Sequence, residues 1–380
     1  MRTISFIQRT IPHYRVRFFE TLHVMAGPAG LALTVYSGEG PEAGKAWGFA
    51  HKTLPVRRLG HREGALCWLG GLDRAVAGSD VIVAPQELQC LNVPYLWIRR
   101  RTLCNHWIWF GHGHNYQASL RPGWASRLKE RVRRFMTRRA DGLLSYTQQG
   151  AAYWRQEGMP VDWAVPFLNT LDVEGLRKAG ADLSQEHLAK ARHELGIEGK
   201  KVLLFSGRLY VQKEVDFLLR ALALLQERRP DTALLILGDG EERRRLEALR
   251  DRLNLRHVHF LGSVVDPSES SLYFRLADLL VIPGLVGLAI VHGFAFGLPL
   301  VTTERDFHSP EIDYLGSETG AMTTHDEQAY ARTIESLLSS PDLLRSMQTC
   351  AARLGDRLTL ARSAERLLDG LNRLCERPST

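Results

Sequence analysis

One turn and one basic pair in the second half of the chain have the residue types that bind a phosphorylated ligand. The turn, Gly284–Gly287, follows an apolar run that ends at Ile282 and precedes a predicted short helix that contains His292. Its glycines allow a phosphate to approach free backbone N–H groups, and the N-terminal end of a helix favours negative charge. The basic pair, Arg208 and Lys213, follows another apolar run. Together these residues predict a diphosphate site at the carboxyl edge of a parallel sheet, where open α/β sheets place their ligands.

The basic pair could stabilise the charge that develops on a departing diphosphate. Arg208 offers a planar fork of donors, whereas Lys213 offers a compact point charge. Lys213 stands just before a predicted helix over Glu214–Arg228, where a cation is unfavourable beside the helix dipole unless an anion offsets it. The alternative is that both side chains are simply solvated at the ends of their elements.

Further polar residues stand at the ends of other predicted elements. His112 and His114 are flanked by glycines directly after the apolar run Trp107–Phe110, so we expect them to face a ligand. An H-x-H pattern with no third ligand nearby is a weak metal signal, and we expect no metal. Glu311 would start a helix, where it either meets the ligand or partners the helix dipole. Arg15, near the start of the chain, is either an exposed arginine or a ligand contact.

The apolar runs that position these residues are continuous rather than alternating. Continuous runs are typical of strands that helices cover on both faces. In the second half, the predicted strands are Val202–Phe205, Ala233–Leu237, Val258–Leu261, Asp278–Ile282 and Leu298–Thr302. In the first half, they are Thr3–Ile7, Leu31–Tyr36, Val81–Ala84, Trp107–Phe110 and Gly142–Tyr146. Because helical patterns separate the runs, the fold class is α/β with doubly wound parallel sheets.

The positive charge of the chain is concentrated in its first half. Residues 1–170 carry 22 Lys and Arg against 11 Asp and Glu, whereas the rest carries 27 against 31. The densest run, Arg127–Arg139, reads as a basic amphipathic helix with Leu128, Val132, Phe135 and Met136 on its apolar side. Such a helix suits the surface of an anionic membrane, but its apolar side could instead pack on a sheet. Nucleic-acid binding has no motif of its own here, and we do not expect it.

Length and cysteine content indicate a two-domain protein of the cytoplasm. At 380 residues the chain exceeds one ordinary core, and no apolar run reaches the roughly 18 residues of a membrane span. The five cysteines form no CxxC motif, so we expect reduced thiols.

Taken in order, the motifs resemble those of the retaining, nucleotide-sugar-dependent glycosyltransferases of family 4. The resemblance covers essentially the whole chain and is strongest over residues 200–312. The motifs that carry it are Tyr14-Arg15, Ser145, Asn169–Asp172, Ser206–Leu209 with Gln212-Lys213, Leu237–Gly240, Phe260–Gly262, and the segment from Gly284 to Pro299 with Pro310-Glu311 beyond it.

The resemblance implies a GT-B fold, in which two Rossmann-like domains face a cleft. Residues 1–170 would bind the acceptor and residues 171–355 the nucleotide-sugar. Residues 356–380 would form a helix that crosses back to the N-terminal domain.

The resemblance also implies roles for single residues. Arg208, Lys213 and His112 would be catalytic. The donor would be bound by Gly207, Gly284, Val286, Gly287, His292 and Glu311, and Arg15 and His114 would lie near the acceptor.

The chain departs from the family pattern at one place. Family members commonly carry two glutamates eight positions apart, where this chain has Gly284 and His292. The pattern Pro-Gly-x-Val-Gly-Leu-x-x-x-His resembles a variant subgroup of bacterial polysaccharide-assembly transferases. A neutral imidazole offers one donor and one acceptor, which suffices for one or two ribose hydroxyls.

We therefore expect a retaining, metal-independent transferase that moves a hexose from a nucleoside diphosphate to a lipid-linked or glycan acceptor, without any cofactor. Its partners would be the nucleotide-sugar, the acceptor and an anionic membrane surface, at the cytoplasmic face of the cell membrane. The first alternative is an inactive nucleotide-sugar-binding subunit that supports a partner transferase. The second is a sugar epimerase of the same fold.

Overall fold

The computed structural model describes residues 1–38, 46–60, 65–113 and 123–377. The chain divides into two compact units. The first unit is Met1–Leu171 with Leu360–Thr380, and the second is Asp172–Thr359. Within the described ranges, no helix has the length and apolar character that crossing a bilayer requires.

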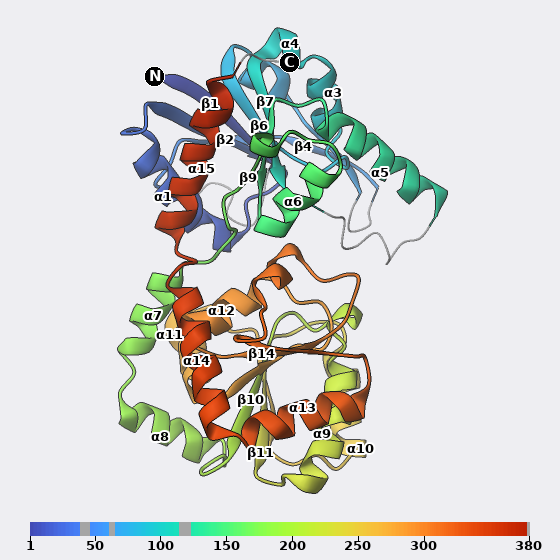
Figure 1. Ribbon diagram of the computed structural model, residues 1–380, viewed down its shortest axis with the longest axis vertical. Coiled ribbons are helices and arrows are strands. Elements are labelled where there is room, and N and C mark those ends of the chain that lie inside the picture. The colour runs from blue at the N-terminus through green and yellow to red at the C-terminus, as the bar shows by residue number, and fades with distance from the viewer. Residues whose placement is uncertain (39–45, 61–64, 114–122, 378–380) are drawn as a thin grey trace. The chain divides into compact units, whose positions relative to one another are not determined.

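The first unit is built on a seven-stranded sheet in which every pairing is parallel, with the order β3-β2-β1-β6-β7-β8-β9 (Figure 1). Its strands are β1 Arg2–Gln8, β2 Leu31–Gly38, β3 His51–Leu54, β6 Ser79–Pro85, β7 Cys104–Gly111, β8 Gly142–Ser145 and β9 Ala164–Pro166. An antiparallel ribbon of β4 Val56–Leu59 and β5 Leu66–Leu69 accompanies the sheet.

Helices cover both faces of this sheet. The helices are α1 His13–Ala26, α2 Leu72–Val76, α3 Asn92–Ile98, α4 Arg100–Leu103, α5 Trp124–Thr137, α6 Gln148–Gln156, the 3-10 turn η2 Val161–Trp163, and α15 Leu360–Cys375. On one face α1 and α15 lie side by side and share a core that includes Phe19 and Leu367 (Figure 1). On the other face α2, α3 and α6 share a second core that includes Trp107 and Trp154.

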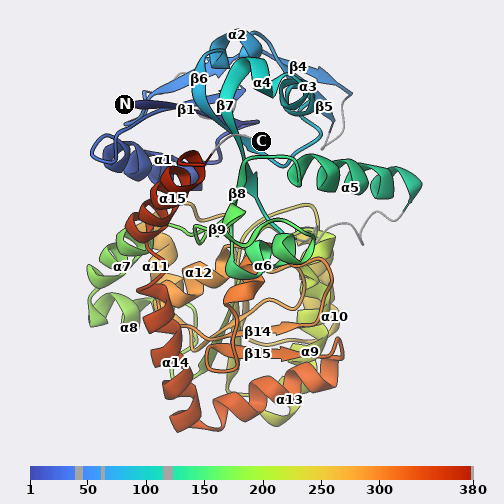
Figure 2. The same ribbon diagram turned by 45° about the horizontal axis from the view of Figure 1, so that its top comes forward.

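The second unit is built on a six-stranded, wholly parallel sheet with the order β12-β11-β10-β13-β14-β15. Its strands are β10 Lys201–Ser206, β11 Thr232–Leu237, β12 Val258–Gly262, β13 Leu279–Val281, β14 Leu300–Thr303 and β15 Gly320–Thr323. Its helices are α7 Val173–Ala181, α8 Gln185–Glu194, α9 Val215–Arg228, α10 Arg243–Arg252, α11 Pro267–Leu276, α12 Ala289–Ala295, α13 Glu327–Leu338 and α14 Pro341–Gly355, with the 3-10 turns η3 Val211–Lys213 and η4 Pro310–Tyr314. Figure 2 shows β14 and β15 side by side, as their parallel register requires.

The predicted α/β class with parallel sheets is confirmed. Each of the ten predicted runs coincides with a strand of the structure to within three residues at either end. The strands that the apolar runs did not predict include β3, β9 and β15, which all lie at the edge of a sheet. An edge strand has one neighbour, so its pairing depends less on a continuous apolar run.

Candidate functional site

The loops that follow β10 and β11 pack on each other through backbone atoms. Gly238 has a φ of 150°, and a Cβ there would lie 1.9 Å from the carbonyl oxygen of Gly207. A Cβ on Gly240 would lie 2.2 Å from the carbonyl oxygen of Leu209. Only glycine fits at both positions, because any side chain would overlap neighbouring backbone. These contacts fix Gly207, and Arg208 after it, at the carboxyl edge of the sheet.

The turn after β13 contacts the segment after β10 just as closely. The N–H of Leu285 donates to the carbonyl oxygen of Gln212 at 2.8 Å. A Cβ on Gly284 would lie 2.3 Å from that oxygen and 2.6 Å from the carbonyl carbon of Lys213. A glutamate at position 284 would therefore displace the Gln212–Lys213 backbone. The first of the two departures from the glutamate pattern thus has a local physical reason.

Lys213 is a buried cation at this edge. The residue is 7% exposed, and its Nζ donates to the carbonyl oxygen of Leu285 at 2.6 Å. Burial lowers the pKa of Lys213 to about 8. The adjacent carboxylate of Glu214 instead pairs with Arg305 at 2.7 Å and with His325 at 3.1 Å. Among the described residues, no Asp or Glu lies within ion-pair distance of the Lys213 ammonium, so the cation is buried without a counter-charge.

His308, which the sequence analysis did not single out, holds the turn after β13. Its Nδ1 accepts from the N–H of Val286 at 3.1 Å, and its Nε2 donates to the carbonyl oxygen of Thr303 at 2.8 Å. Burial, with the nearby charge of Lys213, lowers the pKa of His308, so the ring is neutral with its proton on Nε2. We expected this turn to offer free N–H groups to an anion. The N–H groups of Leu285 and Val286 are instead used inside the protein.

The other predicted site residues of the second unit include Arg208 after β10, Val286 and Gly287 after β13, and Glu311 after β14. The side chain of Arg208 is exposed, whereas Val286 and Glu311 are buried. Glu311 belongs to the 3-10 turn η4 rather than to the start of an α-helix. The N–H of Ser309, just before η4, donates to the carbonyl oxygen of Val286 at 2.8 Å, which joins η4 to the turn that contains Gly287.

His292 lies within α12 and packs against aromatic rings. Its ring stacks on Phe274 of α11 with centroids 3.7 Å apart, and Phe296 lies at 5.8 Å. Burial lowers the pKa of His292 to about 3, so the imidazole is neutral at physiological pH. Its Nε2 is buried without a hydrogen-bond partner among the described residues. Packing against the two phenylalanines therefore does not satisfy the hydrogen-bonding requirement of Nε2.

In the first unit, the structure brings together two residues that are far apart in sequence, Arg15 and His112. The His112 ring, after β7, stacks on Tyr146, after β8, with centroids 5.8 Å apart and planes at 22°. The Tyr146 hydroxyl accepts from Nη2 of Arg15 at 2.7 Å. Burial raises the pKa of Tyr146 to about 12, although Arg15 opposes the shift. Tyr146 was not among the predicted site residues, and its place at the end of the predicted run Gly142–Tyr146 was the only signal for it. His114 lies outside the described residues.

Most apolar residues of the basic helix α5 are exposed, whereas one of its arginines is buried. Its apolar residues Trp124, Leu128, Val132 and Phe135 are exposed, Trp124 to 80%. The alternative that the predicted apolar side packs on the sheet is therefore wrong for Leu128, Val132 and Phe135, but it is confirmed for Met136, which is 3% exposed and lies in the core with Trp109 of β7. The buried positions of the helix are Arg133, Met136 and Thr137.

Comparison with solved structures identifies the fold. The chain is similar to Anabaena HepE in complex with UDP-glucose, with a TM-score of 0.72 and 17% identity over 98% of this chain and 100% of that one. It is similar to sucrose-phosphate synthase from Thermosynechococcus elongatus, with a TM-score of 0.72 and 18% identity over 98% and 99% of the two chains.

Sequence comparison finds a family match within the second unit. Residues 200–340 match the family Glycosyl transferases group 1. The uncharacterized glycosyltransferase MJ1607 of Methanocaldococcus jannaschii is 36% identical over 127 residues, which cover 32% of each chain. The GDP-mannose-dependent alpha-(1-6)-phosphatidylinositol dimannoside mannosyltransferase of Mycobacterium tuberculosis is 29% identical over 196 residues, or 50% of this chain and 49% of the relative. The matched regions thus span between a third and a half of these relatives. The whole chain has the GT-B fold of glycosyltransferases, and its residues 200–340 match the group 1 family.

Proposed function

We propose that the protein is a retaining, metal-independent glycosyltransferase that moves a hexose from a nucleoside diphosphate to a lipid-linked or glycan acceptor in bacterial polysaccharide or glycolipid assembly. The observation that carries this proposal is Lys213. A lysine that is buried without a carboxylate is costly, unless an anion binds beside it. Its place at the carboxyl edge of β10, beside Gly207 and the turn at Gly284–Gly287, is where an open α/β sheet binds its ligand.

A diphosphate fits the arrangement of cations at this edge. Lys213 is fixed by Leu285, and Arg208 extends from the neighbouring loop as an exposed fork of donors. When the glycosidic bond breaks, negative charge grows on the departing diphosphate, and fixed cations stabilise that charge. In this proposal Lys213 and Arg208 neutralise the diphosphate charge, as a divalent metal ion does in other phosphate chemistry. This is the basis for proposing a metal-independent reaction.

Retention of configuration follows from attack on the face that the diphosphate leaves. The acceptor hydroxyl forms its bond to the anomeric carbon as the bond to the diphosphate oxygen breaks, and the departing diphosphate takes the hydroxyl proton. The protein contributes position and electrostatics rather than a covalent intermediate. His112 stands at the end of β7, stacked on Tyr146, and orients the reacting sugar in this proposal.

The relatives support the donor and acceptor classes. HepE is described in complex with UDP-glucose, and the mycobacterial relative is GDP-mannose-dependent and acts on phosphatidylinositol dimannoside. The alpha-monoglucosyldiacylglycerol synthase of Streptococcus pneumoniae is 26% identical over 168 residues. We therefore propose a UDP- or GDP-hexose as donor and a lipid-linked acceptor, with His292 and Glu311 at the nucleoside.

Helix α5 supports a place at the cytoplasmic face of the cell membrane. Four exposed apolar side chains share this helix with a dense set of arginines. An apolar stripe flanked by cations binds the interface of an anionic leaflet, where each cation near the surface contributes about 1 kcal/mol. We name these four residues, Trp124, Leu128, Val132 and Phe135, the α5 docking surface.

Ligand binding and turnover test the proposal together. UDP-glucose and GDP-mannose are titrated into the protein in a thermal-shift assay, because a ligand of the folded state raises the unfolding temperature by mass action. Release of UDP or GDP is then followed with and without a membrane-lipid extract. We expect one donor to stabilise the protein and to be consumed. Binding without turnover would favour the inactive subunit, and an epimerised sugar nucleotide would favour the epimerase.

A further inference from the structure

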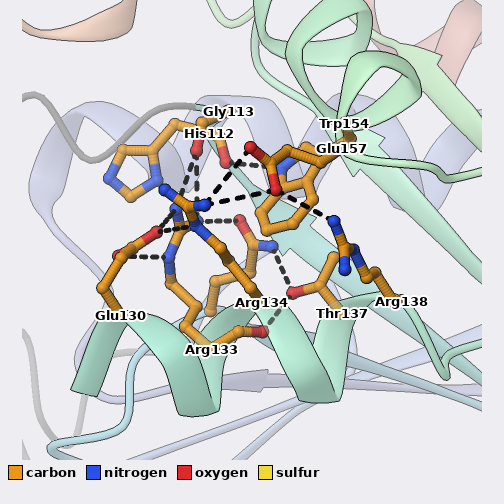
Figure 3. A network of polar contacts seen from close by, with 10 residues as sticks. His112, Gly113, Glu130, Arg133, Arg134, Thr137, Arg138, Trp154 and Glu157 are labelled. Carbon is orange, nitrogen blue, oxygen red and sulfur yellow. Dashed lines mark hydrogen bonds and ion pairs between the residues drawn. The ribbon is translucent and has the colours of Figure 1, made fainter. Parts of the chain in front are cut away.

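Two backbone carbonyls next to the imidazole of His112 are held by one pair of stacked side chains (Figure 3). Both terminal nitrogens of Arg133 donate to the carbonyl oxygen of Gly113 at 3.1 Å. The indole Nε1 of Trp154 donates to the carbonyl oxygen of His112 at 3.2 Å. The Arg133 guanidinium lies over the Trp154 ring at 4.8 Å from its centroid. Because the two donors stack on each other, a movement of Arg133 would disturb the hydrogen bond from Trp154 to His112 as well as its own hydrogen bonds to Gly113.

Arg133 is itself held rigidly. It is 7% exposed, and its Nε and Nη2 donate to the two carboxylate oxygens of Glu130 at 3.0 and 2.6 Å. A bidentate pair of this kind fixes the plane of the guanidinium as well as its position. Gln86, at the end of β6, contributes a longer contact of 3.5 Å to Nη1. The orientation of the Gly113 carbonyl is thus determined by a guanidinium that has little freedom.

The same segment is also closely packed against α6 and Tyr146. A Cβ on Gly113 would lie 2.5 Å from the Cα of Gly150 in α6, so the backbones of the two elements touch. The His112 ring rests on Tyr146, which Arg15 holds through its hydroxyl. The imidazole is therefore clamped through its backbone by α5 and α6 and through its ring by Tyr146.

We propose that Arg133 is a positioning residue for His112. It does not touch the substrate, but it holds the peptide groups that set the direction of the imidazole. This inference rests on the proposed function in one respect, namely that His112 orients the reacting sugar. A displacement of about 1 Å between reacting groups can lower the rate about 100-fold. Loss of the two hydrogen bonds from Arg133 to the carbonyl oxygen of Gly113 should therefore reduce turnover rather than donor binding.

The test compares Arg133→Lys with Arg155→Lys. Lysine keeps the positive charge beside Glu130. It has no planar guanidinium that could donate two hydrogen bonds to the carbonyl oxygen of Gly113 and stack on Trp154. Arg155 is the matched control, since it too donates to two backbone carbonyls in the first unit, those of Val161 and Ala164. Release of UDP from UDP-glucose, or of GDP from GDP-mannose, gives kcat and KM. The imidazole resonances of His112, assigned from their absence in a His112→Asn variant, report its position without any need for activity.

We expect Arg133→Lys to lower kcat at least about tenfold, to leave the donor KM within about twofold, and to shift the His112 resonances. Arg155→Lys should leave all three unchanged. Unchanged kcat and unchanged His112 resonances in folded Arg133→Lys would overturn the inference. If the wild-type protein releases neither UDP nor GDP, the proposed function fails, and the His112 resonances still decide the positioning role. If Arg133→Lys does not fold, Trp154→Phe decides, because it removes the donor to the carbonyl oxygen of His112 and keeps an aromatic face for Arg133. A lowered kcat with shifted His112 resonances supports the clamp, and an unchanged kcat with unchanged resonances excludes it.

Discussion

The ammonium of Lys213 donates to the carbonyl oxygen of Leu285 at 2.6 Å, which joins the segment after β10 to the turn after β13. The same two segments meet a second time, where the N–H of Leu285 donates to the carbonyl oxygen of Gln212. Lys213 therefore has two parts to play. It ties two loops of the second unit together, and it places a positive charge at the carboxyl edge of the sheet.

Replacing Lys213 should reduce turnover strongly but change the unfolding temperature little. Lys213→Met removes a buried charge that has no carboxylate partner, so the unfolding temperature of the free protein should not fall by more than a few degrees. Turnover should fall at least about tenfold, because one cation is lost from the departing diphosphate. Thermal unfolding and release of UDP or GDP measure the two effects. Lys190→Met, at an exposed pair on α8, is the matched control and should change neither.

Donor binding should weaken as the pH rises through about 8, the pKa that burial gives Lys213 in the free protein. Below that pH the ammonium is charged and attracts the diphosphate, whereas above it the side chain is increasingly neutral. The affinity should then fall by up to about tenfold per pH unit, until the pH reaches the higher pKa that Lys213 has beside the bound anion. Calorimetric titration with UDP from about pH 7 to about pH 9.5 measures this, with Lys213→Arg as a variant that stays charged. If the affinity of the Lys213→Arg variant for UDP fell equally steeply with pH, the titrating group would be one other than Lys213.

Gly284 should tolerate no side chain. Gly284→Ala would bring a Cβ to 2.3 Å from the carbonyl oxygen of Gln212, and the backbone must move to relieve the overlap. Overpacking of this kind costs about 1–3 kcal/mol in the free energy of unfolding, which a denaturant titration measures. Gly287→Ala is the control for stability, because its Cβ would lie 3.6 Å from the nearest atom, Oγ of Ser309. Equal stability of the two variants would contradict the backbone contact.

His292→Phe should test whether this ring binds the nucleoside or only packs. Phenylalanine keeps an aromatic face on Phe274 but has no ring nitrogen, so the stack survives and the hydrogen-bonding capacity is lost. If the imidazole contacts the ribose, the donor KM should rise several-fold with a smaller change in kcat, as expected for loss of uniform binding. Steady-state kinetics against donor concentration measure both. An unaltered donor KM would place His292 in the core alone.

The α5 docking surface should bind anionic vesicles. The double change Trp124→Ser and Leu128→Ser removes two exposed apolar side chains, each worth about 1.5–3 kcal/mol when fully buried. Binding to phosphatidylglycerol vesicles in a sedimentation assay should therefore weaken at least about tenfold. The control changes Val265 and Leu343, which are exposed on the second unit. Equal binding to phosphatidylcholine and phosphatidylglycerol vesicles would contradict the role of the arginines.

Much of the fold could be predicted from the sequence because the strands of a doubly wound sheet are buried on both faces. The run Val202–Phe205 lies inside β10, and the four residues are fully buried. No local signal of this kind marks Gly320–Thr323, which forms an edge strand only because β14 lies beside it. The types and spacing of Arg208 and Lys213 likewise predicted a cationic site after one strand, since strand ends are visible in sequence.

What the sequence could not determine is which of its charged and polar residues are buried. The same run of arginines on α5 contains Arg133, which lies against Gly113, and Arg131, which is exposed. The contact that requires glycine at 284 comes from a segment about seventy residues earlier, and His112 is held by residues on α5, α6 and the loop after β8. Local sequence sets the spacing and chemistry of side chains, whereas their burial and partners arise only when distant segments pack together.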